Sequence, residues 1–109
     1  MEPRQRPRLR VEVRSSRVTI IIRDSLTGQI LAVIPSHSEQ LRVGSYTDPA
    51  SIVRILVHIA SKGSAKRMPA DVESVYRVIE SIFLNPQLQP EERVKLAMEA
   101  VRGLRRYMG

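Results

Sequence analysis

The chain has 109 residues and no cysteine, so it holds neither a disulfide framework nor a thiolate metal site. Its 18 Lys and Arg against 11 Asp and Glu give a net charge of +7, the electrostatic footprint that nucleic-acid binding needs. No run approaches the roughly 18 apolar residues of a membrane span, and MEPRQRPRLR lacks the apolar core of a signal peptide. We therefore expect a cytoplasmic protein.

Positive charge is concentrated near the N-terminus. Six arginines against two glutamates give residues 1–17 a charge of +4. Pro3 and Pro7 predict a flexible, Arg- and Pro-rich arm over residues 1–7, followed by a single domain over residues 8–109. The chain has 15 Arg and only 3 Lys. Either this bias serves bidentate recognition of phosphate or carboxylate, or it reflects the codon usage of a GC-rich genome.

Three apolar runs predict a three-stranded antiparallel meander over about residues 8–35. From Leu9 to Val13, apolar and charged residues alternate, which is typical of a half-buried strand. The runs 18–22 and 30–34 are apolar on both faces, so we expect helices to cover one face and a helix or a partner the other. Strict alternation in the third run places Leu31 and Val33 on the same face.

The segment DSLTG predicts a hairpin turn between the second and third strands. Asp24 can accept hydrogen bonds from backbone N–H groups of the turn, and Gly28 can take the positive φ that closes such loops. With Thr27 between them, these residues are the expected structural turn. Ile34-Pro35 ends the sheet, because proline cannot donate to a strand ladder.

Three helices are predicted after a mixed linker at 36–47, in which Ser36 or Ser38 can begin a short helical turn. Asp48-Pro49 is an N-cap followed by proline, and the helix at 49–61 is apolar except for a narrow stripe that includes His58. We expect it to pack against the sheet. The next helix spans 70–84, and the last opens at Pro90. The fold class is therefore α+β.

Catalytic and metal motifs are lacking in the sequence. The two histidines, His37 and His58, have neither cysteine nor a suitably spaced acidic residue beside them, which argues against a zinc or iron site. No serine lies in a nucleophile elbow, and no glycine-rich phosphate-binding loop is present. We expect a protein that is not an enzyme and that uses no cofactor.

One pattern points to a family. The residues V-x-I-x-I-x-D-x-x-T-G-x-x-L-x-x-I-P, from Val18 to Pro35, resemble the core motif of the FlaG family of bacterial flagellar proteins. The chain departs from that motif at Ala32-Val33, where the family usually has Arg-Gln, and at Ser36-His37, which replaces an acidic pair. Two further helices also follow. The resemblance implies a non-enzymatic accessory role at the flagellar filament.

Two functions are consistent with these observations. The first is a protein-interaction or assembly module that binds itself, as a homodimer or higher oligomer, and another protein, with Ile21, Leu31 and Val33 near the contact. The alternative is nucleic-acid binding by an Arg-rich arm, although no aromatic platform for stacking bases is visible. Its candidate contacts are basic residues of the N-terminal segment and of the loop GSAKRMP: Arg4, Arg6, Arg8, Arg10, Arg14, Lys62, Lys66 and Arg67.

Overall fold

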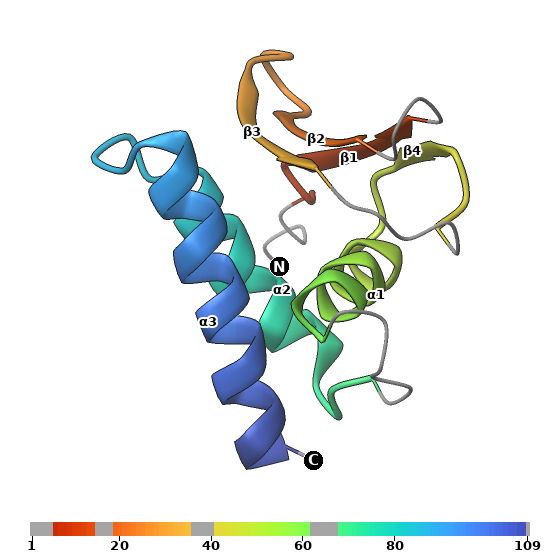
Figure 1. Ribbon diagram of the computed structural model, residues 1–109, viewed down its shortest axis with the longest axis vertical. Helices are drawn as coiled ribbons and strands as arrows, with labels where there is room; N and C mark the ends of the chain where they lie inside the picture. The colour runs from red at the N-terminus through yellow and green to blue at the C-terminus, as the bar shows by residue number, and fades with distance from the viewer. Residues whose placement is uncertain (1–5, 15–18, 36–40, 62–67, 109) are drawn as a thin grey trace, which may run out of the picture.

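The structure, a computed structural model, describes residues 6–14, 19–35, 41–61 and 68–108, with side chains as far as residue 103. These residues form one antiparallel sheet and three helices (Figure 1). The fold is thus α+β, as predicted. The elements are β1 (Leu9–Arg14), β2 (Thr19–Asp24), β3 (Ile30–Pro35), β4 (Gly44–Tyr46), α1 (Pro49–Ala60), α2 (Val72–Phe83) and α3 (Pro90–Met108).

The sheet has the strand order β3-β2-β1-β4. Strands β1 to β3 form the predicted meander, but the expectation of only three strands is wrong. The short strand β4 pairs with β1 through Val11↔Tyr46 and Val13↔Gly44, within a segment that we expected to be linker. The three residues Gly-Ser-Tyr carry no alternating apolar pattern, so sequence gave no sign that they would pair with β1.

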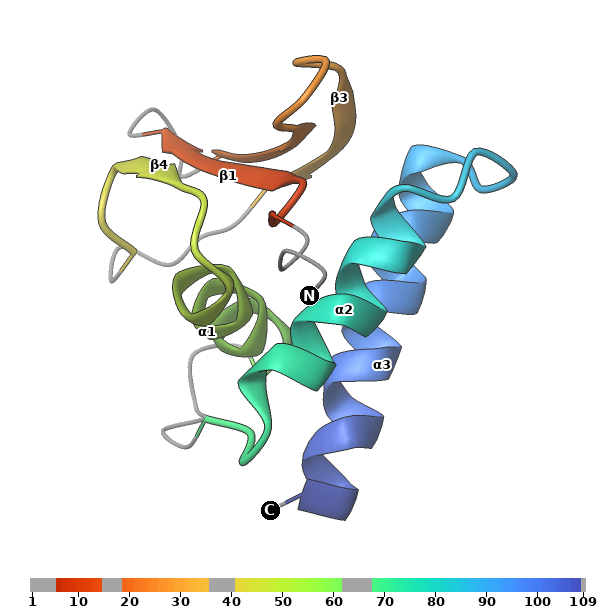
Figure 2. The ribbon, with the colours of Figure 1, turned by 180° about the vertical axis from the view of Figure 1, so that it is seen from behind.

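The helices all lie on one side of the sheet, as the opposite views of Figures 1 and 2 show. Helix α1 begins at the predicted N-cap, where the Asp48 carboxylate accepts a hydrogen bond from the Ser51 N–H at 2.9 Å. Helix α2 begins two residues later than predicted, because Asp71 caps it by accepting from the Ser74 N–H at 3.1 Å. Helix α3 runs alongside α2 and brings its first turn close to β3. None of the helices in the described ranges is long and apolar enough to cross a membrane.

The hydrophobic core lies between the inner face of the sheet and the helices. Apolar residues that alternate along β1 and β2 pack with the buried faces of α1, α2 and α3 in one cluster. Tyr76 and Phe83 of α2 are its largest fully buried side chains. The Tyr76 hydroxyl accepts a hydrogen bond from the Leu9 N–H at 3.2 Å, and burial raises the pKa of Tyr76 above its usual value. The protonated Tyr76 side chain thus connects α2 to the first residue of β1 by a hydrogen bond.

Candidate functional site

The hairpin turn between β2 and β3 contains all three residues expected there. Asp24 Oδ1 accepts from the Leu26 N–H at 2.9 Å, and the Gly28 N–H donates to the Asp24 carbonyl at 2.7 Å. Gly28 has a φ of +79°, which is strained for residues with a Cβ. Thr27 Oγ1 accepts from the Gln29 N–H at 3.2 Å. These contacts give the three residues a structural role in closing the hairpin.

Asp24 also connects the turn to β1. Its carboxylate is buried, and Oδ2 accepts from Arg8 Nη2 at 2.7 Å. Burial raises the pKa of Asp24, but the hydrogen bond from Leu26 and the positive charge of Arg8 outweigh it and leave the pKa below its usual value. The Arg8 N–H donates in turn to Glu80 Oε2 of α2 at 3.0 Å. Arg8 is therefore a structural ion-pair partner.

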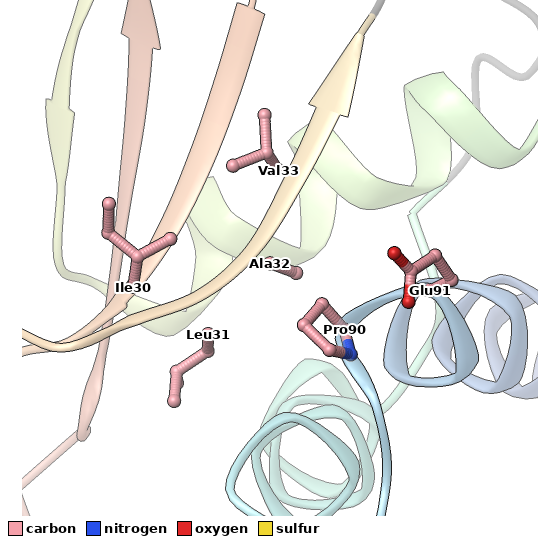
Figure 3. Close-up of a pocket in the computed structure, with 6 residues that line it drawn as sticks. All are labelled: Ile30, Leu31, Ala32, Val33, Pro90 and Glu91. Carbon is pink, nitrogen blue, oxygen red and sulfur yellow. The ribbon is translucent and has the colours of Figure 1, made fainter.

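The main surface feature comes from a β-bulge in β3. Pairing with β2 shifts register between Ile22 and Arg23, so that Leu31 is the extra residue in β3. Residues three apart in a regular strand face opposite sides, but the bulge puts Ile30 opposite Arg23 and Val33 opposite Ile21, on one face. Leu31 instead points away from Ile30 and Val33 (Figure 3). The expectation that Leu31 and Val33 share a face is therefore wrong, and the bulge is the reason.

This bulge creates an exposed apolar surface on the side of the sheet that the helices leave uncovered. Ile30 is 47% exposed and Val33 50%, whereas Ile21 beside them is only 8% exposed. We call these three residues the β3 patch. Of the predicted interface residues, Val33 lies at its surface, Ile21 forms its floor, and Leu31 is buried at 4% exposure on the inner side.

A pocket borders the β3 patch where β3 meets the first turn of α3 (Figure 3). Its volume is about 250 Å³, and it is lined by four consecutive residues of β3, Ile30 to Val33, together with Pro90 and Glu91. The walls are mainly aliphatic, and Glu91 places a carboxylate at one side. A pocket of this size and composition can accept one side chain of a protein partner.

Arg93 holds the two walls of this pocket together. It is buried at 8% exposure, although no acidic residue in the described chain forms an ion pair with it. Its guanidinium donates to the Leu31 carbonyl at 3.0 Å and to the Asn85 carbonyl at 3.1 and 3.3 Å. Arg93 thus provides a donor for the carbonyl of the bulged residue Leu31. It also fixes α3 against β3.

Both edges of the sheet are poor templates for an added strand. On the β3 edge, the Leu31 carbonyl is taken by Arg93, and Pro35 has no N–H to donate. The opposite edge is β4, which has only three residues. Short edge strands, bulges and proline all discourage pairing between sheets of different molecules. An interaction at the β3 patch is therefore expected to use side chains on the face of the sheet.

Charged residues flank the β3 patch on two sides with opposite sign. Toward β2 and β1 lie Arg10, Arg14 and Arg23 around Glu12, which gives these four residues a net charge of +2. Glu12 pairs with Arg23 and, at 3.8 Å, with Arg14; the hydrogen bond from Arg23 lowers the pKa of Glu12, assisted by the arginine charges. Toward α3 lies the exposed Glu91, which lines the pocket, with Lys95 one turn further on. Glu92 instead caps its own helix by accepting from the Gln89 N–H at 3.0 Å.

The basic residues predicted to contact nucleic acid are dispersed. Arg10 and Arg14 are exposed on the outer face of the sheet, and Arg6 is exposed ahead of β1. Arg8 is paired with Asp24. The outer face of the described strands carries no aromatic side chain on which a base could stack. Four of the predicted contacts lie outside the described residues: Arg4, Lys62, Lys66 and Arg67.

The described residues contain no group of three or more His, Asp or Glu side chains that could hold a metal ion. His58 lies on α1, where it is partly buried. His37 is outside the described ranges.

Sequence reasoning missed Ile30, the pocket and Arg93. Ile30 was not among the expected interface residues, because period-two alternation places it on the face opposite Leu31 and Val33 and contains no signal for an extra residue. The pocket joins residues about sixty positions apart, and no local pattern reports such an approach. From the sequence alone, Arg93 would be expected to be a solvent-exposed charge in the first turn of α3. Its only unusual property is burial, which is a property of the tertiary structure.

Comparison of the chain with models of protein families, with curated proteins and with solved structures finds no match to any of them. The class that the structure defines is a small α+β protein with one exposed sheet face. The FlaG resemblance of residues 18–35 stays a prediction.

Proposed function

We propose that this protein is a non-catalytic protein-interaction module that binds through the β3 patch. One observation carries the proposal: the β-bulge turns Ile30 and Val33 to the same face, where each is about half exposed, at 47% and 50%. Single exposed apolar residues are common, but an apolar cluster beside a pocket and rimmed by charges is typical of interaction surfaces.

The composition of the surface supports this choice. The β3 patch supplies an apolar centre, the adjacent pocket offers space for one side chain, and Arg10, Arg14 and Glu91 supply a polar rim. Protein interfaces commonly have such an apolar centre with a charged border. In line with the resemblance of residues 18–35, we place the module among accessory proteins of the flagellum.

Site-specific photocrosslinking tests the proposal. A photoreactive phenylalanine derivative replaces Val33 in the full chain, which is expressed in its native host and irradiated there. The matched control carries the same group at Ser81, an exposed position on α2. We expect a discrete protein adduct from position 33 and none from position 81. Absence of any adduct at position 33, or equal labelling at both positions, would refute the proposed function.

The second candidate function is nucleic-acid binding, favoured by the exposure of Arg10 and Arg14 on one sheet face. Phosphate contacts release counterions, so such binding weakens steeply as salt rises. Fluorescence anisotropy with single-stranded and duplex oligonucleotides, on the wild type and on Arg10→Ala/Arg14→Ala, measures this. We expect weak, non-specific binding with dissociation constants above roughly 1 μM at physiological salt. Tight binding that the double variant loses would favour this second function.

A further inference from the structure

We infer that the β3 patch binds a second copy of this chain, in a two-fold symmetric dimer whose axis runs along β3. The inference rests on the proposed function and names its partner. A two-fold interface brings the same surface of both copies together, so that surface must be self-complementary in charge as well as apolar at its centre. The charges around the β3 patch meet that condition.

The complementarity follows from the order of elements across the surface. The arginine-rich side of β1 and β2, with its net charge of +2, lies on one side of β3. The pocket with the carboxylate of Glu91 lies on the other side. If two copies pack face to face about an axis along β3, the arginines of each copy lie over Glu91 of the other. An axis across the strands would instead oppose arginines with arginines.

The apolar residues occupy the place that such a dimer buries most completely. Ile30 and Val33 lie on β3 and therefore next to the axis, where each packs against its own counterpart. The pocket borders them and can accept an aliphatic side chain from the other copy. Because both sheet edges are blunted, the two copies pack by their faces and do not form a continuous sheet.

A partner of a different kind would fit the surface less well. A uniformly acidic protein would match Arg10 and Arg14 but would meet Glu91 on the opposite flank. A nucleic acid would meet the same carboxylate beside an apolar strand. A second copy offers both signs of charge in the required order, which is why we choose it over these alternatives.

Sedimentation equilibrium of the purified full chain tests the inference. We expect a mass of twice the 12.4 kDa of one chain at micromolar concentrations, with dissociation promoted by salt. Val33→Asp is expected to give a monomer that still melts cooperatively. A wild type that sediments as 12.4 kDa at several hundred micromolar would overturn the inference.

Charge reversal tests the axis. Because symmetry repeats each contact, Arg10→Glu or Glu91→Arg alone is expected to weaken the dimer about tenfold, and the two changes together should restore most of its affinity. Glu99→Arg, an identical charge change further along α3, is the control and should have little effect. A double variant no better than either single variant would refute the arrangement.

The crosslinked adduct separates failure of this inference from failure of the proposed function. An adduct from position 33 with the mass of two chains supports both. An adduct with a different protein, together with a monomeric purified chain, would keep the interaction module and refute the self-association. No adduct would refute the proposed function itself.

Discussion

Asp24 is the residue whose replacement is expected to destabilise the hairpin most. In Asp24→Ala, the Leu26 N–H loses a charged acceptor, and such hydrogen bonds contribute roughly 1.5–3 kcal/mol. Arg8 is about half exposed and regains water, so its ion pair adds only about 0–1 kcal/mol. We therefore expect a loss of about 2–4 kcal/mol, which for a chain of this size lowers the Tm by on the order of 10 °C.

The isosteric change Asp24→Asn separates charge from hydrogen bonding. An amide oxygen can still accept from Leu26, so we expect a smaller loss of about 1–2 kcal/mol at neutral pH. The folded-state pKa of Asp24 is lowered, so its charge stabilises the protein fully above its unfolded pKa, near 4. That contribution disappears as the pH falls through the folded pKa. The wild type should therefore lose its advantage over Asp24→Asn between about pH 5 and the acid limit of folding.

Urea denaturation followed by circular dichroism between pH 3 and 8 measures both effects. Glu99→Gln is the matched control, because it removes one exposed carboxylate without a structural partner in the described chain. Glu12, Asp48 and Asp71 also have lowered pKa values, but they are present in wild type and variant alike and cancel in the difference. A neutral-pH loss below about 0.5 kcal/mol for Asp24→Ala, the usual range for surface changes, would refute the reasoning.

Three further predictions concern the fold. Gly28→Ala should destabilise the protein by about 1–2 kcal/mol because position 28 has a positive φ. Gly103→Ala in α3 should stabilise it by up to about 1 kcal/mol, because alanine favours the helix. Thermal denaturation should therefore show a lower Tm for the first variant and a higher Tm for the second. Arg93→Met should cost about 1–3 kcal/mol in chemical denaturation, since buried carbonyls lose their donor, and an unchanged midpoint would contradict this role. Tyr76→Phe should lower the free energy of unfolding by about 1–2 kcal/mol and speed hydrogen exchange at the Leu9 amide, because that amide loses its acceptor. Unchanged protection of the Leu9 amide would contradict this prediction.

The sequence was sufficient for the elements whose pattern is local. Alternation along Leu9–Val13 and the Asp48-Pro49 cap predicted a strand and a helix start that the structure contains. Strand β4 could not be predicted, because Gly44–Tyr46 pairs only where β1 offers an open edge. The start of α2 was misplaced because Asp71 was not recognised as a cap.

The candidate surface was only partly predictable for a related reason. The sequence indicated that β3 is apolar on both faces, and Val33, which we expected near a protein contact, is exposed in the structure. It could not indicate the bulge at Leu31, which is defined by the pairing with β2, or the hydrogen bond to Leu31 from Arg93, sixty-two positions away. A single added residue changes which side chains reach the surface, and period-two reasoning carries no information about it.

The way the chain enters β1 has a consequence for anything joined to its N-terminal side. The Arg8 N–H is bonded to Glu80 of α2, so the described residues ahead of β1 lie on the helical side of the sheet. In the proposed dimer the two outer sheet faces meet, and the two entry points therefore face away from each other. In that dimer, labels attached at the two entry points would be displayed on opposite surfaces without obstructing the contact.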